Sequence, residues 1–218
     1  MPHAATLRLA AQKKSLHASE RDTPRVQGAR HEYRQNVAPL DATRLKFLDE
    51  AGVNLAMTRR YGRAPRGARV VGAVPHNYGQ SVTLLGVLGS AGLTAAMSVD
   101  GPTDTEVLRV FVEQILVPTL KPGDIVAGAL WAGDNLRVHK VSCIRQAIEA
   151  AGAQVLYLPP YSPDLSPIEE CWSKLKAHLR TLGARTREAL DEALTQAVTA
   201  ITAEDAQGWF NHCGYVLY

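Results

Sequence analysis

Residues 154–181 read QVLYLPPYSPDLSPIEECWSKLKAHLRT, and this stretch decides the class of fold. Gln154–Leu158 is a short apolar run that predicts a strand, and Pro159–Asp164 is rich in turn-forming residues. Over Pro167–Thr181 apolar residues recur at helical spacing. The predicted core face of this helix consists of Ile168, Trp172, Leu175 and Leu179. A strand that passes through a turn into an amphipathic helix is typical of α/β proteins.

The segments upstream extend this pattern. Leu45, Phe47 and Leu48 predict a strand that ends at the acidic pair Asp49-Glu50. Three further runs predict an antiparallel meander: Arg69–Pro75, Ser81–Leu88 and Leu93–Val99. A helix over Thr105–Leu120, a strand over Ile125–Gly133, a helix over Lys140–Ala151 and a last helix over Thr186–Ile201 complete the prediction. A meander followed by β-α-β-α predicts a mixed α/β sheet.

The composition is that of an ordinary globular protein, with 218 residues, 46% hydrophobic and 21% charged. The longest apolar run, Ile125–Gly133, is too short for a membrane span, which needs about 18 residues. The three cysteines, at 143, 171 and 213, form no CxxC pair, and no secretory signal precedes them. These features favour a reducing, cytoplasmic setting and no membrane partner.

Positive charge is unevenly distributed although the net charge is only +3. Residues 1–46 contain nine Lys or Arg against four Asp or Glu, and residues 1–40 predict a linker or arm with one short helix over Val26–Asn36. Five arginines crowd the segment after the first strand without an acid between them: Arg59, Arg60, Arg63, Arg66 and Arg69. This excess indicates a polyanionic partner, and solvated loops are the alternative.

Three carboxylates carry the candidate chemistry: Asp49, Asp134 and Glu169. Sites in open α/β sheets form beyond the carboxyl ends of neighbouring strands. The three side chains converge if the strand of Asp49 lies between the meander and the strand that leads to Asp134. Clustered carboxylates with few nitrogen ligands select Mg²⁺ or Mn²⁺, and two such ions catalyse phosphoryl transfer.

Each candidate residue has a structural alternative. Asp49 and Asp134 also suit turns at strand ends, and Ser166 with Glu169 matches a capping box with a proline at the first helical position. The pair His139-Lys140 suits a helix start. His212-Cys213 is too isolated to indicate a metal site, and both Trp172 and Trp209 suit the core.

The chain from Lys14 onward resembles DDE-type transposases of the insertion sequence six-thirty group, which are bacterial relatives of the mariner transposases. The specific motif is the segment 157–169, YLPPYSPDLSPIE, with Trp172. Weaker matches are KKSLHA at 13–18, FLDEAG at 47–52, RAPRG at 63–67 and DNL at 134–136 with His139-Lys140. Thirty-four residues separate Asp134 from Glu169, as in this superfamily.

The resemblance implies a ribonuclease-H-like fold, a mixed five-stranded sheet flanked by helices, over residues 41–218. It implies that Asp49, Asp134 and Glu169 bind two Mg²⁺ or Mn²⁺ ions and catalyse DNA cleavage at transposon ends and strand transfer to target DNA. Asn135 and His139 would support the site, and a homodimer would form on DNA. The expected DNA-binding residues are Arg59, Arg60, Arg63, Arg66, Arg69, Lys140 and Lys174.

Two departures from the family pattern qualify this expectation. Residues 127–133 add about five residues before Asp134, which puts the geometry of the site and hence its activity in question. The helix-turn-helix region that reads transposon ends in the family is not found, so residues 1–40 are expected to be the linker after it, with an upstream protein as a further partner. The alternative function is an inactive remnant that binds DNA without sequence preference. A hydrolase of RNA in hybrids has only fold analogy in its favour.

Overall fold

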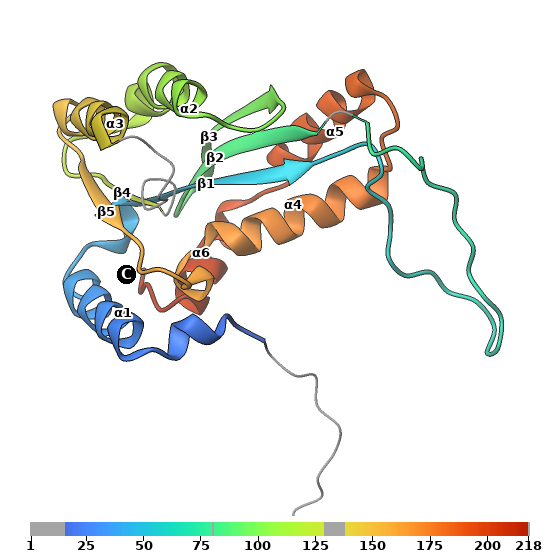
Figure 1. Ribbon diagram of the computed structural model, residues 1–218, viewed down its shortest axis with the longest axis horizontal. Helices are drawn as coiled ribbons and strands as arrows, with labels where there is room; N and C mark the ends of the chain where they lie inside the picture. The colour runs from blue at the N-terminus through green and yellow to red at the C-terminus, as the bar shows by residue number, and fades with distance from the viewer. Residues whose placement is uncertain (1–15, 80, 129–137, 218) are drawn as a thin grey trace, which may run out of the picture.

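The computed structural model describes residues 16–79, 81–128 and 138–217, without the side chains of 138–141 (Figure 1). Five strands form one sheet in the order β3-β2-β1-β4-β5. The strands are β1 (Leu45–Val53), β2 (Val82–Gly89), β3 (Gly92–Asp100), β4 (Ile125–Gly128) and β5 (Gln154–Tyr157). The first three pair antiparallel, whereas β4 and β5 run parallel to β1. The mixed five-stranded sheet is confirmed, and β1 lies between β2 and β4, as the site hypothesis requires.

Helices connect the strands and follow the last one. The α-helices are α1 (Pro24–Val37), α2 (Thr105–Phe111), α3 (Val138–Ala150), α4 (Ile168–Leu182), α5 (Arg187–Thr199) and α6 (Ala203–His212). After α2 the chain continues through a π-helical turn, η3 (Val112–Leu116), and a 3₁₀ turn, η4 (Val117–Thr119). Three further 3₁₀ turns are η1 (Ser19–Asp22), η2 (Ala42–Arg44) and η5 (Pro163–Leu165).

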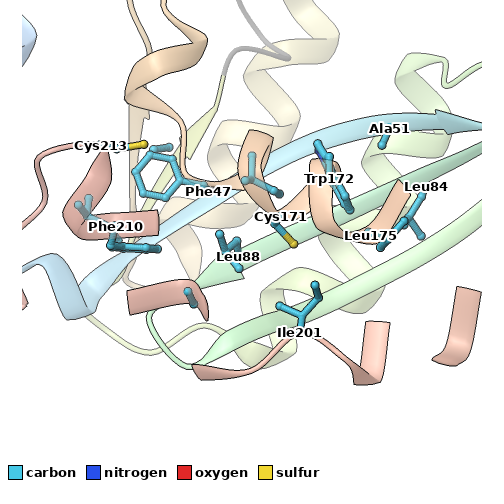
Figure 2. Packing of buried hydrophobic residues seen from close by; sticks show 14 of the residues in the cluster. Phe47, Ala51, Leu84, Leu88, Cys171, Trp172, Leu175, Ile201, Phe210 and Cys213 are labelled. Carbon is cyan, nitrogen blue, oxygen red and sulfur yellow. The ribbon is translucent and has the colours of Figure 1, made fainter. Parts of the chain in front are cut away.

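Two hydrophobic clusters cover the two faces of the sheet. On one face Leu48, Leu85 and Val126 pack against α2, η3 and α3. On the other face Phe47 and Leu84 pack against α4, α5 and α6 (Figure 2). Because successive side chains of a strand point to opposite faces, the central strands supply both clusters. The result is a three-layer α/β/α arrangement.

Helix α1 packs onto the second cluster. Its buried residues include Val26, Tyr33 and Val37. The hydroxyl of Tyr33 lies 2.9 Å from that of Tyr215 near the C-terminal end, and the Tyr215 hydroxyl donates to the carbonyl of Leu165 at 2.5 Å. The predicted helix is confirmed, and α1 contributes to the core. The boundary at residue 40 stays a prediction.

The prediction of a strand over Arg69–Pro75 is wrong. Between β1 and β2, residues 54–79 form a long connection that extends away from the sheet (Figure 1). Val70 and Val71 are exposed on it, at 57% and 90%. A strand needs a neighbour for its backbone hydrogen bonds, and β1 and β3 already pair with both edges of β2. The first strand of the meander is therefore β1.

The expectation that the first strand ends at Asp49 is also wrong, because β1 continues to Val53. Ala51 and Val53 are buried and continue the alternation that Phe47 begins. A polar residue is tolerated in mid-strand because β4 ends opposite Leu48, which leaves Asp49 beyond the carboxyl end of its parallel neighbour.

The helix over Thr186–Ile201 is not the last one. Helix α6 follows, and Thr202 and Asp205 form a capping box at its start. Ala206 and Phe210 bury its inner face. The T-x-x-D pattern at 202–205 is the sequence feature that indicates the start of this helix. No helix in the described part of the chain is long and apolar enough to cross a membrane.

Candidate active site

Asp49 occupies the point where the direction of the sheet changes. Its strand pairs antiparallel with β2 on one side and parallel with β4 on the other. In the antiparallel pair Asp49 lies opposite Gly86, and in the parallel pair the last residue of β4, Gly128, lies opposite Leu48. Asp49 therefore comes directly after the last β1 residue that pairs with β4 among the described residues.

The Asp49 carboxylate is half-buried, and burial raises its pKa from 3.8 to about 6. A backbone hydrogen bond at Glu50 opposes this rise, and the negative charge of Glu169 adds to it. The indole of Trp172 donates a hydrogen bond of 3.0 Å to Oδ2 of Asp49. No cationic side chain among the described residues pairs with Asp49 in the structure.

Glu169 lies in the first turn of α4. Helix α4 begins after Pro167 and has no side-chain cap, so the alternative that Ser166 and Glu169 form a capping box is wrong. Glu169 is instead an exposed residue. Partial desolvation raises the pKa of Glu169, and the positive charge of Lys176 opposes the rise.

Asp49 and Glu169 line one pocket of about 210 Å³. Its other lining residues are Leu48 and residues of the segment 158–166, which connects β5 to α4. Tyr161 in this segment has a φ of 54°, in the left-handed region that non-glycine residues rarely adopt. Such backbone strain is concentrated at functional sites, where the surrounding structure holds it in place.

The second predicted acid, Asp134, lies outside the described residues, as does Asn135. His139 and Lys140 belong to the first turn of α3, but their side chains also lie outside the description. The start of α3 agrees with the helix-start interpretation of this pair. The structure thus brings together two of the three predicted acids, and a role for Asp134 stays a prediction.

Arg30 of α1 holds the segment between β5 and α4, and the sequence did not indicate this role. Its guanidinium donates to Ser162 Oγ at 2.6 Å, and to Asp164 Oδ1 and Oδ2 at 3.0 and 2.7 Å. The Arg30 side chain is 3% exposed. Arg21 adds a contact of 3.1 Å to the same carboxylate. Helix α1 therefore fixes a wall of the pocket by a bidentate pair.

The predicted DNA-binding side chains fall into two groups. The arginines of the β1–β2 loop are all exposed, and none forms an ion pair within the described residues: Arg59, Arg60, Arg63, Arg66 and Arg69. Lys174 differs, because it pairs with Asp205 of the α6 capping box. Of the two tryptophans expected in the core, Trp172 is buried and also contacts Asp49, and Trp209 is partly buried.

The cysteine near the C-terminal end has a carboxylate neighbour. The thiol of Cys213 lies 3.9 Å from Glu170 Oε2, and His212 Nε2 lies 3.8 Å from Glu170 Oε1. Burial raises the pKa of Cys213 to about 12, so its thiol stays protonated at neutral pH. Among the described residues no three His, Cys, Asp or Glu side chains cluster as a metal site would require.

Solved structures with a similar fold include those of the Mos1 mariner transposase. The pre-cleavage Mos1 transpososome aligns with a TM-score of 0.68 at 16% identity, over 95% of this chain and 64% of the Mos1 chain. The Mos1 paired-end complex with Mg aligns with a TM-score of 0.70 at 12% identity, over 95% and 65%. The isolated Mos1 catalytic domain aligns with a TM-score of 0.56 at 13% identity, over 93% of this chain and 92% of the Mos1 chain. This chain therefore has the ribonuclease-H-like fold of a transposase catalytic domain and spans less than two thirds of the longer Mos1 chains.

The family of the chain is assigned by comparing its sequence with protein-family models. Comparison with curated proteins finds no match. The model described as "DDE superfamily endonuclease" matches residues 44–191, which include β1, the segment 157–169 and Glu169. The match covers more than half of the chain and both described carboxylates of the pocket. The chain therefore belongs to the DDE superfamily endonuclease family.

Proposed function

We propose that the chain is the catalytic domain of a transposase of the insertion sequence six-thirty group, which cleaves DNA at transposon ends and transfers the strand to target DNA. The observation that carries this proposal is the pocket shared by Asp49 and Glu169. The two carboxylates come from a central strand and a helix far apart in sequence, and the family match covers both.

The donor set of the pocket fits a hard divalent cation. Two carboxylates lie near each other in a partly desolvated position, and no cation among the described residues pairs with Asp49. Oxygen ligands of this kind select Mg²⁺ or Mn²⁺. Asp49 and Glu169 would hold the ions, with Asp134 as the expected third ligand. When bound, two such ions activate an attacking oxygen and stabilise the leaving oxygen of a phosphodiester.

The protein's own contribution is to orient these ligands. Trp172 fixes the Asp49 carboxylate by its N–H, and Arg30 fixes the wall of the pocket through Ser162 and Asp164. The exposed arginines of the β1–β2 loop are suited to phosphate contacts, which position DNA without reading its sequence. Solved Mos1 neighbours include paired-end complexes with transposon DNA and crystals with Mg or Mn, which supports DNA and these ions as partners. A homodimer on DNA and an upstream helix-turn-helix protein belong to the same proposal.

The direct test is nicking of a supercoiled or end-labelled DNA substrate with Mg²⁺ or Mn²⁺. We expect metal-dependent cleavage by the wild-type chain and loss of cleavage in Asp49→Asn, Asp134→Asn and Glu169→Gln. Circular dichroism should show that each variant stays folded. Cleavage that survives in all three single variants would overturn the assignment of the site.

The same assay distinguishes an active transposase domain from the second candidate function, an inactive remnant that only binds DNA. An inactive remnant would bind DNA with strong salt dependence and no sequence preference, but would show no metal-stimulated cleavage. The exposed loop arginines favour binding in either case, so the cleavage assay decides between the two candidates.

A further inference from the structure

A groove of about 350 Å³ lies where the β1–β2 loop leaves the sheet beside the last turns of α4. Figure 1 shows this loop departing next to the C-terminal end of α4. Three cationic side chains line the groove, from the loop and from the helix: Arg60, Lys176 and Arg180. Its other lining residues are uncharged, so no carboxylate opposes an anionic ligand there.

The two helical cations lie in line with the candidate active site. Glu169, Lys176 and Arg180 are seven and four residues apart on α4, which places them on one face of the helix. At 1.5 Å per residue, Lys176 lies roughly 10 Å and Arg180 roughly 16 Å along the axis from Glu169. The field of Lys176 reaches Glu169, whose pKa it lowers against the effect of burial. The groove therefore lies along α4 from the pocket, and its first helical cation is roughly 10 Å from Glu169 along the helix axis.

The three cations are free to bind a ligand. Within the described residues, Arg60, Lys176 and Arg180 form no ion pair. The neighbouring basic side chains are already engaged: Lys174 pairs with Asp205, Arg187 pairs with Asp100, and Arg185 donates to backbone carbonyls. The cations that line the groove are thus ones without an ion pair within the described residues.

The floor of the groove is held in place. Arg185 Nη1 donates to the carbonyls of Leu55 and Met57 at 3.0 and 2.9 Å. The amide of Leu55 donates to the carbonyl of Tyr78 at 3.2 Å, which closes the loop at its base. These hydrogen bonds fix the two ends of the loop relative to each other. Arg60 follows the fixed residues in sequence and lines the groove beside α4.

Aromatic side chains accompany the cations. Tyr78 lines the groove and is 64% exposed. A second hollow of about 290 Å³ adjoins it through Arg60 and Arg180, and Tyr61 on its rim is 91% exposed. A cationic groove with exposed aromatic rings is the arrangement that binds a nucleic-acid strand, with phosphates on the cations and bases on the rings.

We propose that this groove, formed by Arg60, Lys176 and Arg180, binds the phosphate backbone of the DNA strand that enters the pocket of Asp49 and Glu169. The inference rests on the proposed function, because it takes DNA as the substrate, and it identifies the path of the strand. It assigns the helical contacts to Lys176 and Arg180, whereas Lys174 on the same helix faces α6.

The test measures binding of the 218-residue chain to a fluorescent DNA duplex without divalent ions, as a function of salt. The slope of log K against log[salt], where K is the DNA-binding constant, is negative. Each lost phosphate contact reduces its magnitude by about 0.9 on duplex DNA and about 0.7 on a single strand. For the double variant Lys176→Gln/Arg180→Gln we expect a slope smaller by about 1.4 to 1.8. The control is Lys174→Gln, which removes one positive charge from the same helix at a position paired with Asp205 and should keep the wild-type slope.

A cleavage assay run in parallel separates this inference from the proposed function. If the wild-type chain cleaves DNA while the double variant keeps the wild-type slope, the groove is not the path of the strand and the transposase proposal stands. A loss of slope in Lys174→Gln that is half that of the double variant, and so equal per charge removed, overturns the inference as well, because it shows a general charge effect. If the wild-type chain neither binds nor cleaves DNA, both proposals are wrong.

Discussion

Trp172 donates its indole N–H to Oδ2 of Asp49 at 3.0 Å, and the two residues come from the helix and the strand that meet at the pocket. Trp172 is 3% exposed and lies over Gly86, the residue opposite Asp49 in β2. A hydrogen bond to the charged form of a carboxylate favours ionisation and fixes its orientation. Outer partners of this kind tune metal ligands in proteins. Trp172 is therefore a positioning residue for Asp49 in the proposed metal site.

Replacing Trp172 with Phe removes the N–H and keeps an aromatic ring in the core. Because the N–H lowers the pKa of Asp49, its loss should raise that pKa further above about 6. Protons and Mn²⁺ compete for the carboxylate, so the pH midpoint of Mn²⁺ binding should rise by about one unit. Titration of Mn²⁺ by electron paramagnetic resonance at several pH values measures this midpoint.

The control for that substitution is Trp209→Phe, which changes a partly buried tryptophan of α6 that packs against the same core. Within the part of the chain that the structure describes, Trp172 and not Trp209 donates a hydrogen bond to Asp49, so the Mn²⁺ midpoint of Trp209→Phe should match the wild type. Equal shifts in both variants would mean that loss of aromatic packing, and not the hydrogen bond, causes the effect.

Gly86 provides the space that Trp172 occupies. A Cβ at position 86 would lie 2.5 Å from Cη2 of Trp172 and 3.0 Å from Cδ2 of Leu93. Both neighbours are held in the core, so Gly86→Ala should cost about 1 to 3 kcal/mol of unfolding free energy and displace the indole from Asp49. Urea denaturation and Mn²⁺ binding measure the two effects. Gly52→Ala on β1 is the control, because a Cβ there meets nothing within 4 Å.

Much of the fold could be predicted from the sequence because the alternation of apolar residues reflects burial. The runs at 81–88 and 93–99 became β2 and β3, and the helical spacing over Pro167–Thr181 became α4. The run Arg69–Pro75 has the same local pattern, yet it is no strand since no neighbour pairs with it. Local periodicity reports the face that can be buried, but pairing depends on the whole sheet.

The candidate site was predicted in part for a similar reason. Asp49 and Glu169 were identified from their motifs, and the sheet order brought them together. The roles of Arg30 and Trp172 were missed because their partners, Asp164 and Asp49, are distant in sequence. The residues that surround Arg30 in the sequence do not indicate that it forms a buried ion pair with a distant carboxylate.

The raised pKa of Asp49 predicts a pH-dependent stability. Its folded pKa of about 6 exceeds the ordinary 3.8, so its ionisation destabilises the fold as pH rises through this interval. In Asp49→Asn this penalty disappears. The variant should therefore be more stable than the wild type at pH 7, by up to about 3 kcal/mol, and the difference should vanish near pH 4. Urea denaturation without divalent ions tests this, and a difference independent of pH would contradict it.

Arg30 ties α1 to the wall of the pocket, so its removal should destabilise the fold. Arg30→Ala leaves Ser162 and Asp164 without their buried donor. Breaking a buried pair costs about 3 to 5 kcal/mol, and we expect about 3 because Asp164 stays 37% exposed.

The effect of Arg30→Ala on the free energy of unfolding should depend on pH. Raising the pH should make this variant less stable relative to the wild type, whereas it should make Asp49→Asn more stable. The guanidinium of Arg30 holds the pKa of Asp164 below its ordinary 3.8. The pair therefore stabilises the fold at neutral pH, and this contribution is lost as pH falls through the folded pKa. Unfolding free energies at pH 7 and in acid should show the difference between variant and wild type shrinking in acid. Arg25→Ala, at an exposed position of the same helix, should change stability by no more than about 0.5 kcal/mol at either pH. A similar loss in both variants would mean that the substitution acts through α1 itself and not through Asp164.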